Sequence, residues 1–334
     1  MAAVTLSMIA REAGVSRPVV SKVLHGGTTT VGVSAATEAR ILAVAAAMGY
    51  RPNSAARAIS RGRFDTIGLV IGTRNDTSQL PAYLLHGILE EAQAQGMHVS
   101  VDRLPDEHLT KDGFVPRFLS ELIADGLLID YTHKIPSPML DQLSTSLLPC
   151  VWLNSMQPRD AVYPDDEQGG RLATRHLLGL GHRRILFYDD SDRVHYSSNA
   201  RFEGYRSAMV AAGCEPLSFR ECLPDARQLE ALVAFMRAKR PTALIPYDRP
   251  WTPVVAASLL GLRIPQDLSM VAFAGKPFTS FGQEFTVAII PQHEEGREAV
   301  RMLLRRIADP SLHEEPVALP FTLEAHSTTA APGR

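Results

Sequence analysis

Five side chains within one short segment have the chemistry needed to read the edges of DNA bases. Arg17, Pro18, Ser21, Lys22 and His25 stand at i, i+1, i+4, i+5 and i+8, so on a helix they share one exposed face. The two basic groups can donate hydrogen bonds to guanine O6 and N7, and the proline can make an apolar contact with a thymine methyl group. The serine and the histidine suit contacts with phosphate oxygens.

Three helices are predicted to hold this face in place. Thr5 is the expected N-cap of a helix that ends at Gly14, and Ser16 is the expected cap of the second helix, which carries the polar face. Ser34 is the expected cap of the third helix, whose buried positions are predicted to include Ile41 and Leu42. Two short helices joined by a tight turn and braced by a third are typical of a helix-turn-helix DNA reader. We count Thr5 and Ser16 with the predicted DNA contacts.

Charge is distributed unevenly along the chain. Residues 1–63, the head, hold eight basic and two acidic groups, a net charge of +6. The remaining residues, 64–334, are the body; they hold 26 basic and 34 acidic groups, a net charge of −8. A basic head is expected to meet a polyanion such as DNA. A three-helix bundle with a merely solvated polar face remains the alternative.

The end of the head could form a short helix that depends on docking. Asn53 could cap about two turns, Ala56 is one of several small residues that permit close packing against a second copy, and Ile59 would be an apolar wedge at the end. So short a helix is marginal in water. We therefore predict that it forms only on DNA, with a flexible linker as the alternative.

In the body, apolar strands alternate with amphipathic helices, which predicts an α/β fold of two doubly wound lobes with parallel sheets. Ligands of such folds bind outside the carboxyl ends of the strands, where this chain places polar and aromatic side chains. Carboxylates, amides and rings suit a small polyhydroxylated molecule. The candidate effector-binding residues are Asn75, Tyr83, Asp130, Asn154, Asp189, Arg201, Asp248 and Trp251.

The chain resembles the lactose repressor/galactose repressor (LacI/GalR) family of bacterial transcription regulators. The resemblance lies in TLSMIAREAGVSRPVVSKVLHGG and VSAATEARILAVAAAMGYRPNSAARAI in the head, and in GGRLATRHLLGLGHRRILF and NARFEGY in the body. It implies a helix-turn-helix head, a hinge helix that enters the minor groove of a palindromic operator, a homodimer, and an effector-binding core like periplasmic sugar receptors. It also implies that Arg201 and Asp248 contact the effector, although a surface ion pair is the alternative role for Arg201.

The expected domain limits follow from the predicted elements and from the family resemblance. They are 1–50 for the DNA-binding domain, 51–63 for the hinge, and 64–334 for the effector-binding core, with an N-lobe of about 64–160 and 291–318 and a C-lobe of about 161–290 and 319–330.

Several classes of protein are disfavoured. No phosphate-binding loop, nucleophile elbow or zinc-protease motif occurs, so an enzyme is a weak alternative, and a sugar receptor without a DNA role is disfavoured by the basic head. The three cysteines lack metal-ligand spacing, and we predict neither a metal nor a cofactor. No stretch is long and apolar enough for a bilayer, and we expect a cytoplasmic protein with no membrane partner.

Overall fold

The computed structural model describes residues 4–25, 32–52, 58, 62–73, 78–104, 119, 121, 123–132, 135–146, 148–191, 195–248 and 250–333. The chain divides into two compact units, Met1–Asp65 and Thr66–Arg334. The head lies in the first unit, and all but the first two residues of the body form the second.

The head contains three helices, α1 (Leu6–Ala13), α2 (Arg17–His25) and α3 (Ala35–Ala47). The predicted caps of α1 and α3 are confirmed: Thr5 Oγ1 accepts a hydrogen bond from the Met8 amide at 3.4 Å, and Ser34 Oγ accepts one from the Thr37 amide at 3.3 Å. Gly14 ends α1 in the left-handed conformation, φ 65°, which costs glycine little.

One small core holds the three helices of the head together. Its buried residues are Ile9, Ala10, Ala13, Val20, Ile41 and Ala45. The prediction that Leu42 is also buried is wrong, because 48% of this residue is exposed. Ile41 and Ala45 set the buried face at i and i+4, and the next residue along the helix is rotated about 100° away from that face.

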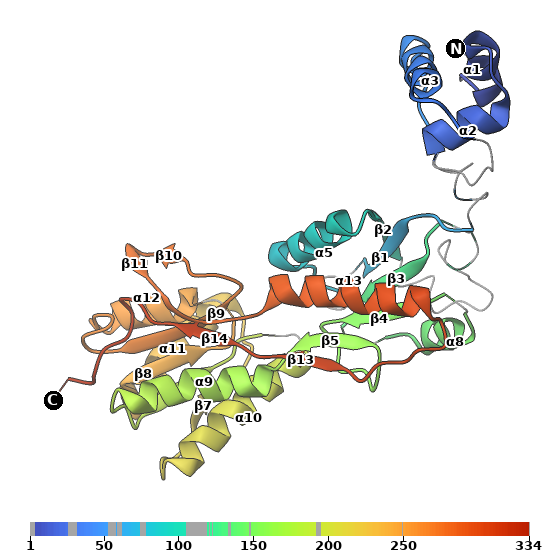
Figure 1. Cartoon of the computed structure of the whole chain (residues 1–334). Helices are drawn as coiled ribbons and strands as arrows, with labels where there is room; N and C mark the ends of the chain where they lie inside the picture. Colours follow the sequence, from blue (N-terminus) through green and yellow to red (C-terminus); the bar gives the residue numbers. More distant parts are fainter. Residues whose placement is uncertain are drawn as a thin grey trace. The chain divides into compact units, whose positions relative to one another are not determined.

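The N-lobe of the body is built on a sheet whose neighbouring strands are all parallel, in the order β13-β5-β4-β3-β1-β2. The strands are β1 (Thr66–Gly72), β2 (His98–Leu104), β3 (Gly126–Asp130), β4 (Cys150–Leu153), β5 (Ala161–Pro164) and β13 (Val317–Leu319). One face packs against α5 (Ala82–Ala94) and α13 (Gln292–Ala308), and the other packs against α8 (Ser137–Thr145) (Figure 1).

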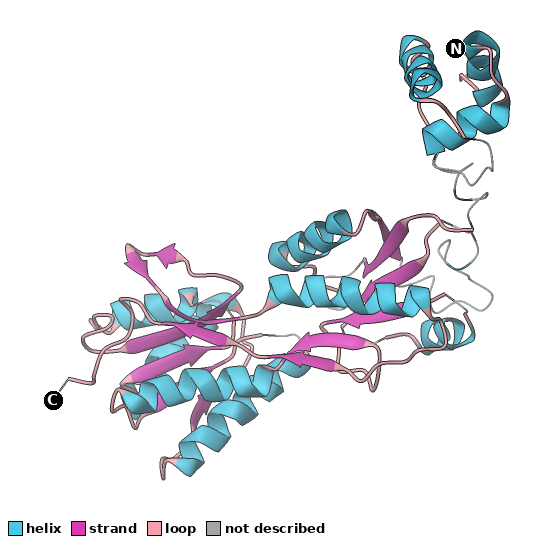
Figure 2. Cartoon of the chain, viewed as in Figure 1, coloured by secondary structure: helices cyan, strands magenta, loops and turns pink. Residues whose placement is uncertain are grey.

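The C-lobe has a second sheet, in the order β14-β12-β9-β8-β6-β7, in which only β14 runs antiparallel to its neighbour. Figure 2 shows helices on both faces of this sheet. The strands are β6 (Ile185–Tyr188), β7 (Leu217–Phe219), β8 (Ala243–Pro246), β9 (Ser269–Ala274), β12 (Thr286–Ile289) and β14 (Thr322–Glu324). Helices α9 (Asp166–Gly179) and α10 (Tyr196–Ala211) cover one face, and α11 (Asp225–Lys239) and α12 (Trp251–Leu259) cover the other. A short hairpin, β10 (Thr279–Ser280) and β11 (Gln283–Glu284), completes this lobe.

The chain passes between the lobes three times, from β5 to α9, from β12 to α13 and from β13 to β14. The predicted first limit at residue 160 is one strand too early, because β5 pairs with β4 and so belongs to the N-lobe. The alternation of apolar and polar segments did not reveal β5, because its four residues, Ala-Val-Tyr-Pro, end in a proline, which is uncommon within strands. The predicted α/β fold with a helical head is confirmed.

Candidate DNA-reading face and effector cavity

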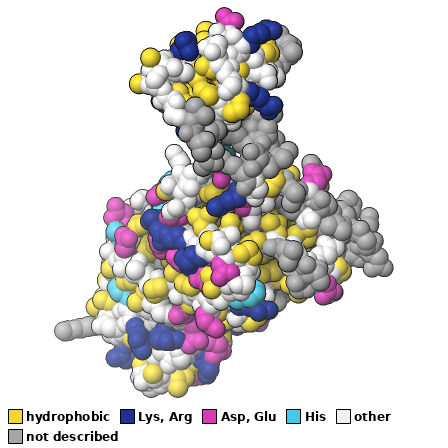
Figure 3. All heavy atoms as spheres, turned by 45° about the vertical axis from the view of Figure 1, so that its right-hand side comes forward, with side chains coloured by type: hydrophobic (Ala, Val, Ile, Leu, Met, Phe, Trp, Pro, Cys, Tyr) yellow, Lys and Arg dark blue, Asp and Glu magenta, His cyan; other side chains and the backbone are white. Residues whose placement is uncertain are grey.

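Helix α2 presents the five side chains predicted to read DNA. Arg17 and Pro18 are exposed and Ser21, Lys22 and His25 are half-buried. Figure 3 shows Lys and Arg side chains at several places on the visible face of the head. Outward-facing cations on a helix of this size suit the major groove of DNA.

The end of α2 is tied to the segment after α3. The Tyr50 hydroxyl and His25 Nε2 lie 3.2 Å apart and share a hydrogen bond. This contact fixes the last turn of α2, so the polar face is held in one orientation relative to the head's core. Ser16 is exposed just before α2, and Thr5 caps α1. Asn53, Ala56 and Ile59, the predicted hinge contacts, lie outside the residues that the structure describes.

In the body, a cavity of about 250 Å³ lies where the carboxyl ends of the two sheets meet. The N-lobe contributes Thr132 after β3 and Asn154 after β4, and the C-lobe contributes Ser191 after β6 and Asp248 after β8. This is the position at which open α/β sheets bind ligands. Its lining is dominated by hydrogen-bonding groups, which suits a polar ligand.

Arg201 lines the cavity from α10 and is held by a buried ion pair. Its Nε donates to Asp166 Oδ1 at 2.7 Å and its Nη1 donates to the Tyr247 carbonyl at 2.9 Å. The guanidinium also lies over the ring of Phe273, 4.5 Å from the centroid. Burial alone would lower the pKa of Arg201, but the negative groups around it, with Asp166 the largest contributor, together raise it, so the cation persists. The alternative of a surface ion pair is wrong, because both partners are more than nine-tenths buried.

Two buried acidic side chains, Asp130 and Glu295, lie on N-lobe elements near the cavity. Asp130 is fully buried, and burial raises its pKa to about 7 against the opposing hydrogen bond from Ser78. Burial also raises the pKa of Glu295 well above its usual range; the nearby charge of Asp130 adds to this rise, and a hydrogen bond with the Asn154 backbone opposes it. Glu295 lines the cavity, and its Oε1 has no hydrogen-bond partner among the described residues. A raised pKa favours the protonated form of this carboxyl, and in that form it can donate a hydrogen bond to a ligand.

The predicted effector contacts divide into two groups. Asn154, Arg201 and Asp248 line the cavity together. Asn154 adopts φ 48°, a left-handed conformation that asparagine tolerates better than most residues, and its Oδ1 accepts a hydrogen bond from the Tyr196 hydroxyl at 3.1 Å. These three therefore remain the predicted effector contacts.

The other predicted contacts that the structure describes do not line the cavity. Asp130 is held by Ser78, as described above. Asp189 accepts hydrogen bonds from Ser191 and Ser198. Tyr83, on α5, faces the ammonium group of Lys276, which lies 5.3 Å from the ring centroid. Trp251 packs edge-on against Phe278 and Phe281. Asn75 lies outside the described residues.

Several lining residues were not predicted from the sequence. Tyr247 directly precedes Asp248 and could have been found by the same rule, because it also follows β8. His195 and Ser197, which share a hydrogen bond of 2.6 Å, stand at the start of α10 and carry no spacing signal. Gln292 and Glu295 belong to the polar run QHEEGRE, which is typical of an exposed helix start.

Two family models match the chain. Residues 5–53 match the model of bacterial regulatory proteins of the lacI family, and residues 174–329 match that of periplasmic binding protein-like domains. The chain belongs to the LacI family of bacterial regulatory proteins. It is therefore a DNA-binding transcriptional regulator and not an enzyme.

Relatives of this LacI-family chain span nearly its whole length. The transcriptional repressor PurR of Aliivibrio fischeri is 28% identical, covering 91% of this chain and 92% of PurR. The transcriptional regulator CelR of Thermobifida fusca is 29% identical over 96% of both chains. The lac repressor dimer bound to operator and the anti-inducer ONPF has the same fold, with a TM-score of 0.80, 22% identity, and coverage of 99% of this chain and 100% of that one.

None of the helices in the described part of this LacI-family chain is both long enough and apolar enough to cross a membrane.

Proposed function

We propose that this protein is a homodimeric repressor that binds a palindromic operator, and that a small polyhydroxylated effector in the interlobe cavity controls its affinity for DNA. The protein then acts in the cytoplasm, where DNA lies. Residues 1–50 read the major groove, residues 51–63 form the hinge, and residues 64–334 bind the effector. The observation that carries the proposal is the convergence of Asn154, Arg201 and Asp248 on one cavity between the lobes.

The DNA role rests on α2. Its Arg17 is exposed and its Lys22 is half-buried, whereas Val20 is buried in the head's core. A single head reads only a half-site, and a two-fold dimer presents two heads to a palindrome. The lac repressor dimer bound to operator, which shares this fold, supports that arrangement.

The effector class rests on the hydrogen-bonding groups of the cavity. Arg201 supplies a fixed cationic donor, Asp248 supplies a carboxylate acceptor, and Glu295 supplies a buried carboxyl group whose pKa is raised by burial. Neighbouring hydroxyls of a sugar or nucleoside both donate and accept hydrogen bonds, so they match such a mixed set. A CelR regulator of similar fold, with a TM-score of 0.62, was solved as a cellobiose complex, which makes sugars the first class to test.

The effector proposal is tested by thermal unfolding of the full chain with a panel of mono- and disaccharides, sugar phosphates and nucleosides. A ligand that binds only the native state raises the unfolding temperature, by an amount that grows with the logarithm of ligand concentration above the dissociation constant. We expect at least one polyhydroxylated compound to do so and to change operator affinity. Stabilisation only by compounds that lack neighbouring hydroxyls would contradict the proposed effector class.

Asp248→Asn locates the ligand within the protein. This side chain is exposed, so the fold should survive, and the variant should bind the stabilising compound about tenfold more weakly or worse, because a hydrogen bond to a charged group contributes ~1.5 kcal/mol or more. The matched control is Glu230→Gln, which removes an exposed carboxylate from α11, away from the cavity lining. Equal affinities of the two variants would place the ligand elsewhere.

A further inference from the structure

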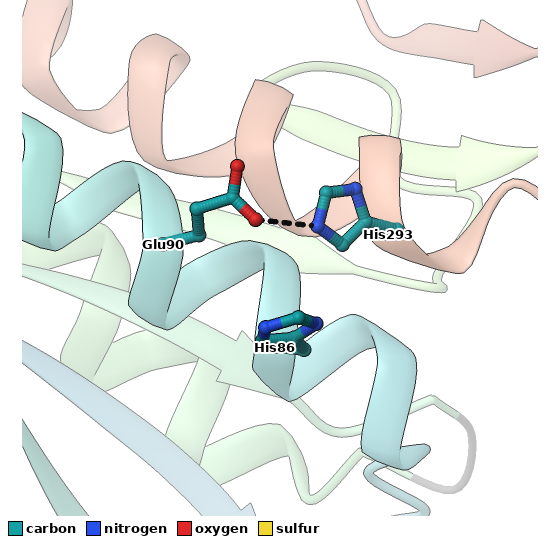
Figure 4. A group of neighbouring side chains, drawn as sticks. All are labelled: His86, Glu90 and His293. Atoms are coloured by element: carbon teal, nitrogen blue, oxygen red, sulfur yellow. Dashed lines mark hydrogen bonds and ion pairs between the residues drawn. The ribbon is translucent and has the colours of Figure 1, made fainter.

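Three potential metal ligands meet on the surface of the N-lobe. His86 and Glu90 lie one turn apart on α5, and His293 faces them from the first turn of α13 (Figure 4). One ligand atom from each residue lies within 4.8 Å of the other two. His293 Nε2 and Glu90 Oε2 are 3.0 Å apart, and the two imidazole rings have centroids 5.4 Å apart.

Two glycines hold the helices in the register that this arrangement needs. A Cβ atom on Gly87 would collide with the backbone of His293, and one on Gly296 would collide with the carbonyl of Leu84. The backbones of α5 and α13 are therefore nearly in contact, directly beside the three side chains. Because the packing of these two helices already fixes the site, binding of a ligand orders few further groups and its entropic cost is lower.

Ion pairs with arginine take up the other carboxylates in this region. Glu91, which is buried, is bound by Arg297 at 3.1 Å and by Arg301 at 2.9 Å, and Arg301 also binds Glu294 at 3.0 Å. Glu90 has His293 as its ion-pair partner among the described residues. The carboxylate of Glu90 therefore lies beside the two imidazoles, while arginines neutralise the carboxylates of Glu91 and Glu294.

We propose that His86, Glu90 and His293 bind a divalent transition-metal ion of the Zn²⁺ type, with water completing the coordination. Two imidazole nitrogens and one carboxylate oxygen suit Zn²⁺, whereas Mg²⁺ and Ca²⁺ prefer oxygen ligands alone. Bonds of ~2.0 to 2.1 Å place the ligand atoms of a tetrahedral zinc site roughly 3.3 Å apart, a spacing that side-chain rotation can reach here. Glu90 and His293 have side chains 51% and 37% exposed, so water can reach the ion.

Such an ion links the site to the effector cavity. It crosslinks α5 to the first turn of α13, and that turn also carries Gln292 and Glu295, which line the cavity. His293 lies between these two residues in the chain, so the ion and the effector would restrain the same turn. The proposal for the metal itself does not depend on the effector.

The test is calorimetric titration of the metal-free, reduced full chain with Zn²⁺. We expect one ion per chain, and an affinity at least about tenfold weaker in each of His86→Asn, Glu90→Gln and His293→Asn, because even the loss of an outer-shell partner costs ~10 to 100-fold in metal affinity. The control is His98→Asn, which removes an exposed imidazole of β2 in the same lobe and should leave the affinity unchanged. Excess Mg²⁺ should not compete.

The proposal is overturned if Zn²⁺ does not bind stoichiometrically, or if the three ligand variants bind it as the wild type and His98→Asn do. Because His293→Asn could disturb the helix contact, His86→Asn serves as the second variant, since its side chain is exposed on α5. Its circular dichroism spectrum should match that of the wild type. Zn²⁺ should raise the unfolding temperature of the wild type but not that of this variant.

Discussion

In the head, the residues predicted to read base edges come from one helix of nine residues, whereas the effector cavity collects side chains from positions as far apart as Gln79 and Glu295. On the reading face, Arg17 is exposed and Lys22 is half-buried. The cavity instead fixes its central cation, Arg201, in a buried pair with Asp166. Substitution of an exposed residue of the reading face, such as Arg17, should therefore change binding alone, whereas substitution of a buried residue of the cavity wall, such as Arg201, should change folding and binding together.

The largest loss of stability is expected from Arg201→Ala in the cavity wall. Removing the guanidinium leaves the Asp166 carboxylate buried without its partner, so the free energy of unfolding should fall by about 3 to 5 kcal/mol. Urea unfolding of the full chain measures this loss. At this cost the variant should lose effector and operator binding together at elevated temperature.

Two controls separate the buried pair from ion pairs in general. Arg171→Ala breaks an exposed pair with Glu167 on α9 and should cost less than ~1 kcal/mol. Adding Asp166→Asn to Arg201→Ala should restore part of the stability, because the unpaired charge is removed. Equal stability of the Arg201 and Arg171 variants would mean that the buried Arg201–Asp166 ion pair does not stabilise the cavity wall.

The second effect is the dependence of stability on pH, which Asp130 should impose. Its pKa of about 7 in the native state lies above the ordinary carboxyl value, so the native state holds this proton more tightly than the unfolded state does. The stabilisation is complete below about pH 4 and is lost as the pH rises to about 7, by up to ~4 kcal/mol. Asp130→Asn should gain stability relative to the wild type across this window in urea titrations, and parallel pH profiles would contradict the prediction.

The contrast between head and cavity also explains what the sequence could reveal. Arg17 and Lys22 were found from helical spacing, which is a local property of the chain. Glu295 could not be found in this way, because its run of charges indicates a solvated helix start and its burial arises from the packing of α13 at the junction of the lobes. Trp251 was predicted to cover a ligand, but it packs against Phe278 and Phe281, and no periodic pattern indicates where the hairpin region would place these two rings.

The order of the strands was likewise beyond local patterns. A strand such as β4 is a continuous apolar run, which a local pattern can indicate. The strands that were missed, β5, β7, β12, β13, β14 and the hairpin strands β10 and β11, are two to four residues long and are defined by their partners in the sheet. Arg201 and Asp248 were assigned through resemblance to a family, and their convergence on one cavity is a tertiary property.

A smaller effect is expected on the reading face. Lys22→Ala should weaken operator binding by roughly 1 to 3 kcal/mol if Lys22 contacts a base, without changing the stability of the body. Gel-shift titrations at several salt concentrations measure both affinity and its salt dependence, which should be steep for a head of net charge +6. The control is Lys239→Ala, an exposed lysine at the end of α11. Equal operator affinities for the two variants would exclude Lys22 from the interface.

The smallest effect is expected at Thr5, which was predicted as a DNA contact and also caps α1. Loss of the hydrogen bond from the Met8 amide in Thr5→Ala should destabilise the head by about 1 kcal/mol, while Thr5→Ser keeps a hydroxyl that can accept it. Hydrogen exchange of the α1 amides in the full chain reports this change, and exchange in the body should stay the same. If Thr5 acts only as a cap, the serine variant binds operator like the wild type and the alanine variant loses affinity in step with its faster exchange. Weak binding by both variants, with slow exchange kept in the serine variant, would instead make Thr5 a direct contact, and the reading face would then extend beyond α2.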